Sequence, residues 1–153
     1  MSSKYQIYIE NIPKLESVLT GLSPQQLDYR QSEDRWNIRE IVAHLADSEI
    51  QVYTRYRAIL SDDVPFIANH NEANWSRVLN HRIADVTESL GTMKLIRGLN
   101  YRLIASLSES ELQKEGLHST RGRISVQDLV ESHIRHLENH IGQIERNLLA
   151  LKC

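Results

Sequence analysis

The sequence contains a single cysteine, Cys153, among its 153 residues. One thiol excludes an internal disulfide and a CxxC redox pair, and it cannot supply the set of thiolates that often closes a structural zinc site. This low cysteine content fits a protein of the reducing cytoplasm. Any thiol chemistry that the protein performs would therefore need a thiol from outside the chain.

Basic runs and long apolar runs are also absent. Lysine and arginine are dispersed and the net charge is -2, so nothing favours binding to nucleic acid or to an anionic membrane surface. No apolar stretch approaches the roughly 20 residues of a membrane span, and the start MSSKYQIYIE lacks the apolar core of a signal peptide. We therefore expect a soluble, cytoplasmic protein that acts on a small-molecule substrate.

The sequence is instead typical of one globular domain spanning residues 1–153, with 41% hydrophobic and 25% charged residues. Capping residues predict where two helices begin: Asn37 with Glu40, and Ser125 with Asp128. Repeats, low-complexity stretches and strand-period hairpins are absent, so the sequence predicts an all-α four-helix bundle. Its long helices, each with apolar residues at helical period, are expected at about residues 5–20, 36–60, 83–107 and 126–152.

The connections between these helices are expected to hold short extra helices. Residues 23–26 carry a capping box, residues 74–79 predict a short helical piece, and residues 108–116 predict a turn or short helix. Residues 120–123 predict a tight loop. Within the first long segment, Pro13 is expected either to kink the helix or to mark a new start.

Histidines lie on the apolar stripe of the last predicted helix. His133, His136 and His140 fall on or beside this stripe. Residues four apart share one helix face, with Cβ atoms about 5–6 Å apart, so His136 and His140 can present imidazole nitrogens to one ion. A third ligand must come from another helix.

The best third ligand is His44, which lies inside the apolar stripe of the second predicted helix, next to Ile41 and Leu45. Helical bundles build metal sites from inward-facing side chains on different helices. His44, His136 and His140 would give three neutral imidazoles and leave at least one coordination position open. An open position is typical of a catalytic metal site.

Other interpretations of the histidines remain open. A histidine on an apolar helix face is often only a hydrogen-bonded, half-buried side chain. The segment 136–140 is not the HExxH zinc-protease motif, because Glu138 stands two positions after the first histidine and points away from both. His133 could replace a ligand or pack beside His136, whereas His70 and His81 suggest no role.

Further side chains are candidates for roles around the metal. Asp47, three residues after His44, is predicted to contact an imidazole or a metal-bound water, although it could equally be a carboxylate on the rim of the bundle. His118 is predicted as a proton shuttle at the open end of the site, the alternative being a solvated loop histidine. Arg55 and Arg57 could hold an anionic substrate or simply cover the surface.

Three segments carry a resemblance to a known family. Residues 36–49 (WNIREIVAHLADSE), 122–128 (GRISVQD) and 136–144 (HLENHIGQI) resemble the DinB superfamily, particularly its YfiT-like members. Residues 22–27 (LSPQQL) and 71–75 (NEANW) are similar to connecting segments of that family. The resemblance therefore spans nearly the whole chain and includes the order of the elements.

The resemblance implies a divalent metal, usually nickel or zinc, at His44, His136 and His140. Characterised members include thiol transferases, which join a low-molecular-weight thiol to an electrophile, and thiol-dependent isomerases; many others carry provisional names as hydrolases. Homodimers are common in the family. We therefore expect thiol transfer to, or hydrolysis of, a small electrophilic substrate. The alternatives are a non-catalytic bundle that binds a metal or ligand, and an interaction module without metal.

Overall fold

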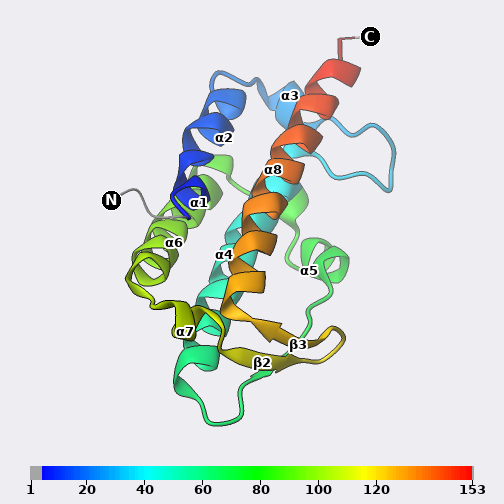
Figure 1. The fold of residues 1–153 in the computed structure, drawn as a ribbon. Coiled ribbons are helices and arrows are strands. Elements are labelled where there is room, and N and C mark those ends of the chain that lie inside the picture. Colours follow the sequence, from blue (N-terminus) through cyan, green and yellow to red (C-terminus); the bar gives the residue numbers. More distant parts are fainter. Residues whose placement is uncertain (1–4, 153) are drawn as a thin grey trace.

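The computed structural model of the protein describes residues 5–152 and contains the four predicted long helical segments (Figure 1). They are α1 with α2 (Ile7–Glu10 and Ile12–Leu19), α4 (Ile38–Ser61), α6 (Val86–Ser106) and α8 (Val126–Ala150). The predicted four-helix bundle is thus confirmed. None of the helices within the described residues is both long enough and apolar enough to cross a lipid bilayer. Cys153 lies outside the described residues.

The predicted caps define the starts of the two helices that carry the candidate ligands. Asn37 accepts a hydrogen bond from the backbone N–H of Glu40, and the Glu40 carboxylate accepts one from the backbone N–H of Asn37 at 2.8 Å. Ser125 and Asp128 form the same reciprocal pair at the start of α8. Pro13 marks a new start, because it occupies the first turn of α2, where a missing backbone N–H costs no hydrogen bond.

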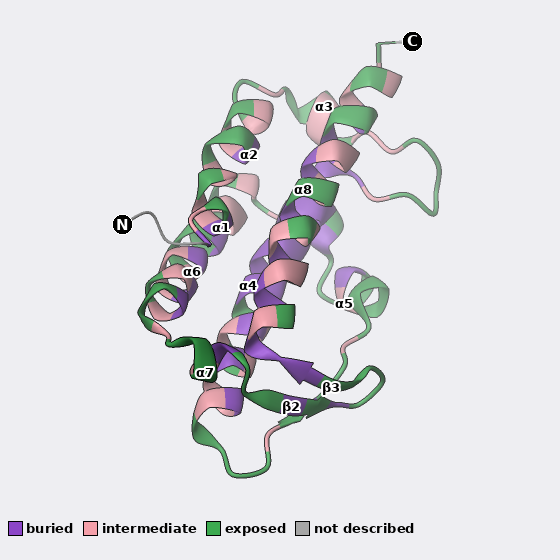
Figure 2. Ribbon diagram, viewed as in Figure 1, coloured by how far each residue is buried: buried purple, intermediate pink, exposed green. Residues whose placement is uncertain are grey.

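Short helices connect the long ones, as predicted. The predicted ones are α3 (Pro24–Asp28), α5 (Glu72–Val78) and α7 (Glu109–Leu112), and the 3-10 helix η1 (His81–Ile83) was not predicted. The central helix α4 packs against α6, α8, α3, α5 and η1. This central position explains why α4 is buried along much of its length (Figure 2).

The expectation that the chain contains no strand hairpin is wrong. Strands β2 (Glu115–His118) and β3 (Gly122–Ser125) form an antiparallel hairpin, and β1 (Phe66–Ile67) pairs with β2 in parallel. These strands are too short to show a clear alternation of apolar and polar residues. In addition, the inward positions of β2 are Gly116 and His118, so an alternation of apolar residues is not visible in the sequence.

The core has two apolar clusters along the bundle. One lies near the sheet and includes Tyr8, Tyr56 and Ile124, and the other lies towards the opposite end and includes Leu15, Ile41 and Ile141. His44 lies beside Leu45 of the second cluster, so the packing of α4 against its neighbours determines the direction of the His44 side chain. The apolar core thus positions the polar site.

Gly116 allows β2 to pack closely on α4. A Cβ atom at this position would lie 2.9 Å from both Ile59 Cγ1 and Ile67 Cδ1 and 3.3 Å from the carbonyl oxygen of Pro65. We expect Gly116→Ala to lower the free energy of unfolding by about 1–3 kcal/mol through this overpacking. The matched control is Gly91→Ala on the exposed face of α6, where the added Cβ meets no atom within 4 Å.

The control should stabilise the protein by up to about 1 kcal/mol, because alanine has a higher helix propensity than glycine. Urea unfolding of the three proteins, followed by circular dichroism, measures both effects. A Gly116→Ala variant as stable as the parent would show that the hairpin can move away from α4 at little cost.

Candidate metal centre

Three imidazole rings from two helices meet at one point between α4 and α8. His44 Nε2 lies 2.9 Å from His136 Nε2, and His140 Nε2 lies 3.2 Å from the same atom. Each of the three histidines offers one ring nitrogen, and these three nitrogens all lie within 4.8 Å of one another. The structure therefore brings together the three residues that the sequence singled out as metal ligands.

This donor set fits a divalent metal ion. Zinc–nitrogen distances are about 2.0–2.1 Å, so two imidazole nitrogens in a tetrahedral site lie roughly 3.3 Å apart. The distances of 2.9 Å and 3.2 Å from His136 Nε2 to the Nε2 atoms of His44 and His140 are within a few tenths of an ångström of this spacing. A cation would satisfy all three lone pairs at once, which a hydrogen bond between two rings cannot do. Imidazole suits zinc and nickel alike, so the geometry does not select between them.

Neighbouring side chains hold the rings in place. His140 Nδ1 lies 2.9 Å from Gln143 Oε1, and because this oxygen only accepts hydrogen bonds, the contact places the proton on Nδ1 and leaves Nε2 free to bind a metal. The Trp36 ring stacks on His140 at a centroid distance of 6.3 Å and packs against His44 at 5.0 Å. Trp36 directly precedes the cap of α4, so the start of this helix also builds one wall of the site.

The histidines of the site are uncharged at neutral pH. Burial lowers the pKa of His44 to about 3 and that of His136 to about 2, and the nearby His140 ring adds to both effects. Burial also lowers the pKa of His140. Since a metal binds only the neutral imidazole, no proton has to be removed from these rings before a cation can bind at neutral pH.

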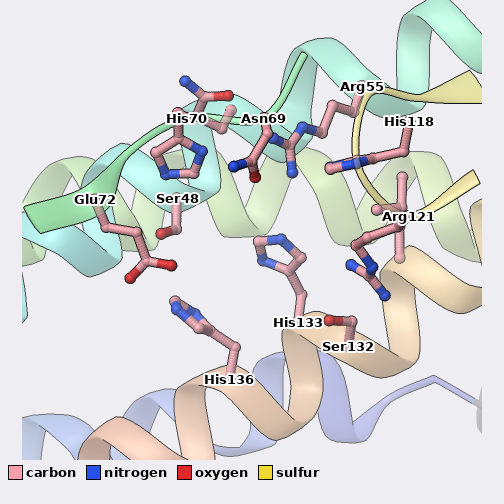
Figure 3. A pocket seen from close by; sticks show the side chains of 12 residues that line it. Ser48, Arg55, Asn69, His70, Glu72, His118, Arg121, Ser132, His133 and His136 are labelled. Carbon is pink, nitrogen blue, oxygen red and sulfur yellow. The ribbon is translucent and has the colours of Figure 1, made fainter. Parts of the chain in front are cut away.

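A polar cavity of about 260 Å³ opens beside His136, one of the three histidines (Figure 3). Helices α4 and α8, the segment 69–72 and the β2–β3 hairpin contribute side chains to its wall. His136 reaches the cavity directly. Its other lining residues include Ser48, Arg55, Glu72, His118, Arg121 and His133.

Comparison with known proteins identifies the family. The sequence model of the DinB superfamily matches residues 8–144. The chain belongs to the DinB superfamily. Its fold is similar to the solved structure of YfiT from Bacillus subtilis, which is described as having an unusual four-helix bundle topology. That match has a TM-score of 0.87 and 26% sequence identity, and it covers 94% of this chain and 82% of YfiT.

Curated relatives of the chain carry provisional names as metal-dependent hydrolases. YfiT of Bacillus subtilis (strain 168) is 27% identical over 138 residues, which is 89% of this chain and 78% of YfiT. OB0413 of Oceanobacillus iheyensis is 27% identical over 135 residues, 86% of this chain and 76% of the relative. These names agree with the presence of a three-histidine group in this DinB protein.

Two carboxylates of this DinB protein contact histidines on α4 and η1, and the sequence pointed to only one of them. Asp47 Oδ2 lies 3.2 Å from His81 Nε2, and within residues 5–152 Asp47 forms no ion-pair contact with the three site histidines. Its catalytic role stays a prediction. Glu72 Oε2, at the start of α5, lies 3.5 Å from His44 Nε2. The sequence did not predict Glu72 as a site residue, because the irregular connection before α5 has no regular spacing of apolar residues from which the direction of the Glu72 side chain could be inferred.

His118 and His133 occupy different positions in the same cavity wall. His118 is buried, and its Nδ1 accepts a hydrogen bond from the backbone N–H of Thr120 at 3.2 Å. His118 and His136 both line this cavity. The role of His118 as a proton shuttle stays a prediction. His133 lies outside the three-histidine group: its ring packs 5.6 Å from that of His136, and its Nδ1 lies 3.8 Å from Glu49 Oε1.

Proposed function

We propose that this DinB protein is a metal-dependent enzyme. In this proposal His44, His136 and His140 hold a divalent ion, zinc or nickel, that activates water or a small thiol for attack on a small electrophilic substrate. The observation that carries the proposal is the convergence of three neutral imidazoles, one of which, His136, lines a polar cavity; within residues 5–152 this group includes no fourth ligand. A divalent ion supplies a nucleophile near neutral pH, because it lowers the pKa of a coordinated water or thiol.

The surrounding residues suit the transfer of the proton that such a nucleophile loses. The Glu72 carboxylate lies 3.5 Å from His44 Nε2, and its side chain is 53% exposed, so it can pass a proton on to solvent. Ser48 Oγ lies 3.4 Å from His44 Nε2 and lines the same cavity, where it can orient a bound group. The only cysteine of the chain is Cys153, so in the thiol version of the reaction the thiol is a second substrate.

The test is a turnover assay with zinc-loaded and nickel-loaded protein. Small esters and amides are offered alone, and small electrophiles are offered with cysteine or glutathione as the thiol. We expect metal-dependent turnover that His44→Ala abolishes. Product formed only when a thiol is present supports thiol transfer, and product formed without a thiol supports hydrolysis. Stoichiometric metal binding with no turnover of any of these substrates would favour the non-catalytic metal-binding alternative.

Glu72 and Asp47 are expected to respond differently to substitution. We expect Glu72→Gln to lower kcat by about 100-fold through the loss of a general base, with the metal content unchanged. Asp47→Asn is the matched control, because Asp47 faces His81 and not the three site histidines. Steady-state kinetics and metal analysis of both variants measure these effects. A larger loss of kcat in Asp47→Asn would identify Asp47 as the base, as the sequence alone suggested.

A further inference from the structure

Two arginines without acidic partners face the end of the cavity that lies away from Glu72 and His136. Arg55 comes from the second half of α4, and Arg121 comes from the turn between β2 and β3. Within residues 5–152, neither arginine forms an ion pair with a carboxylate. The charge of Arg121 contributes to lowering the pKa of Asp128, but the two side chains form no ion pair, so the N–H groups of both arginines are available to a bound molecule.

The two guanidinium groups lie close enough to influence each other. Burial lowers the pKa of Arg55, and the charge of Arg121 lowers it further. Burial likewise lowers the pKa of His118, with smaller contributions from both arginines. Like charges held together destabilise the charged forms of both groups. An anion bound between them would remove this cost, which is why paired arginines without acids are typical of anion-binding sites.

Other groups at the arginine end of the cavity also offer hydrogen bonds. One N–H of Arg55 donates to the carbonyl oxygen of Ala68 at 3.0 Å, which holds the guanidinium in place and leaves its other N–H groups for a ligand. Asn69 and Ser132 line the cavity beside the arginines. A carboxylate or phosphate group fits this set of donors, because each of its oxygens can accept several hydrogen bonds.

The charges in the cavity are separated along its length. Figure 3 shows Arg55, His118 and Arg121 at one end, and Glu72 with His136 at the other. The arginines attract an anionic group to their end, whereas the Glu72 carboxylate offsets part of the positive charge that a bound divalent ion would add at the opposite end. A bound molecule would therefore be oriented with its anionic group at the arginines and its other end at His136.

We propose that Arg55 and Arg121 bind the carboxylate or phosphate group of a small substrate and so direct its reactive end towards the three histidines. This inference rests on the proposed function for the role of the bound molecule, but the anion site itself does not require a metal. The cavity volume of about 260 Å³ restricts the ligand to a small molecule.

The experiment measures binding of three probes to metal-free protein by calorimetry: succinate, inorganic phosphate and succinamide, the uncharged analogue of succinate. Variants Arg55→Gln and Arg121→Gln each remove one guanidinium. Each has a matched control in the same element. Arg57→Gln on α4 removes a side chain that stacks on Tyr53, and Arg123→Gln in the hairpin removes an exposed arginine that pairs with Glu115 at 3.3 Å.

We expect succinate or phosphate to bind the parent and both controls, and to bind Arg55→Gln and Arg121→Gln about 10-fold to 100-fold more weakly, because each variant loses charged hydrogen bonds. Whichever of the two anions binds more tightly identifies the anionic group. Succinamide should not bind. Equal affinity of the parent and the two arginine variants, binding of succinamide as tightly as succinate, or no binding of either anion to the parent would overturn the proposal.

Failure of the anion site can be distinguished from failure of the metal site. In the double variant His136→Ala/His140→Ala, anion binding should persist, since the arginines remain. Conversely, Arg121→Gln should retain the metal content of the parent, because Arg121 lies outside the three-histidine group. Loss of anion binding in the histidine double variant would show that the anion binds at the histidines and would overturn the proposal. Arg121 lies in an exposed turn, so its substitution should leave the fold intact.

Discussion

The double variant His136→Ala/His140→Ala is expected to bind no zinc or nickel, whereas the parent protein should hold about one divalent ion per chain, because three ligands converge on one point. The double variant keeps only His44, and a single imidazole does not hold a divalent ion against dialysis. Inductively coupled plasma mass spectrometry after reconstitution and dialysis, on protein without a histidine tag, measures the metal content directly.

The control for this prediction is His133→Gln. His133 lies on the same helix, and its ring is 5.6 Å from that of His136, but it stands outside the converging group. This variant should keep the metal content of the parent. Circular dichroism confirms that each variant is folded. If the double variant retained the ion, or if His133→Gln lost it while remaining folded, the assignment of the three ligands would be wrong.

The three-histidine group could be predicted from the sequence because it depends on regular helices. The apolar stripes of α4 and α8 indicate which side of each helix faces the core, and the caps at Asn37 and Ser125 indicate where each helix begins. Once these are known, the directions of His44, His136 and His140 follow from helical geometry.

Two residues of the cavity, Glu72 and Arg121, could not be predicted because they come from irregular segments. Glu72 follows a loop, and Arg121 lies in the turn of a hairpin whose strands have four residues each. The direction of a loop side chain depends on tertiary contacts, and no sequence period reports these contacts. Arg55 lies on a regular helix and was a candidate for holding an anionic substrate, but the sequence does not show that Arg121 lies beside it.

The core of the bundle also contains charges that the apolar pattern does not reveal. The inner face of α6 consists of Met93, Arg97, Asn100 and Ile104, spaced at helical period, so two of its four buried positions are polar. A search for apolar residues alone finds a gap at Arg97 and Asn100. Their partner is Glu49 on α4, a contact that only the packing of the two helices reveals.

Glu49→Gln is expected to lower the free energy of unfolding by about 3–5 kcal/mol, because it leaves Arg97 charged and buried without its partner. The side chains of Arg97 and Glu49 are only 1% and 3% exposed. Glu49 also accepts hydrogen bonds from the Tyr8 hydroxyl at 3.1 Å and from Asn100 Nδ2 at 3.0 Å. A glutamine side chain can still accept these two bonds, so the loss reports the missing charge together with the hydrogen bond that Arg97 donates to Glu49 Oε1.

The matched control is Glu16→Gln, which removes the acid of an exposed ion pair with Lys94 on the same helix as Arg97. Because both side chains are about 40% exposed, this change should cost less than about 1 kcal/mol. The double variant Glu49→Gln/Arg97→Met should lose less stability than the sum of the two single variants, since it removes both buried charges. Additive losses would show that Arg97 and Glu49 are not energetically coupled.

The cost of Glu49→Gln should also depend on pH. Burial alone would raise the pKa of Glu49, but its contacts with His133, Arg97 and Asn100 outweigh burial and lower the pKa from the usual 4.5 to about 2. A carboxyl group with a lowered pKa in the folded state stabilises the protein above its unfolded pKa, and this stabilisation is lost as the pH falls from 4.5 towards 2.

Urea unfolding of the parent and of Glu49→Gln at pH 7 and at pH 3 tests this pH dependence. The difference between the two proteins should be largest at pH 7 and smaller at pH 3, because part of the stabilisation by ionised Glu49 is lost there. A difference that is the same at both pH values would mean that Glu49 stabilises the fold through its shape and hydrogen bonds, and not through its charge.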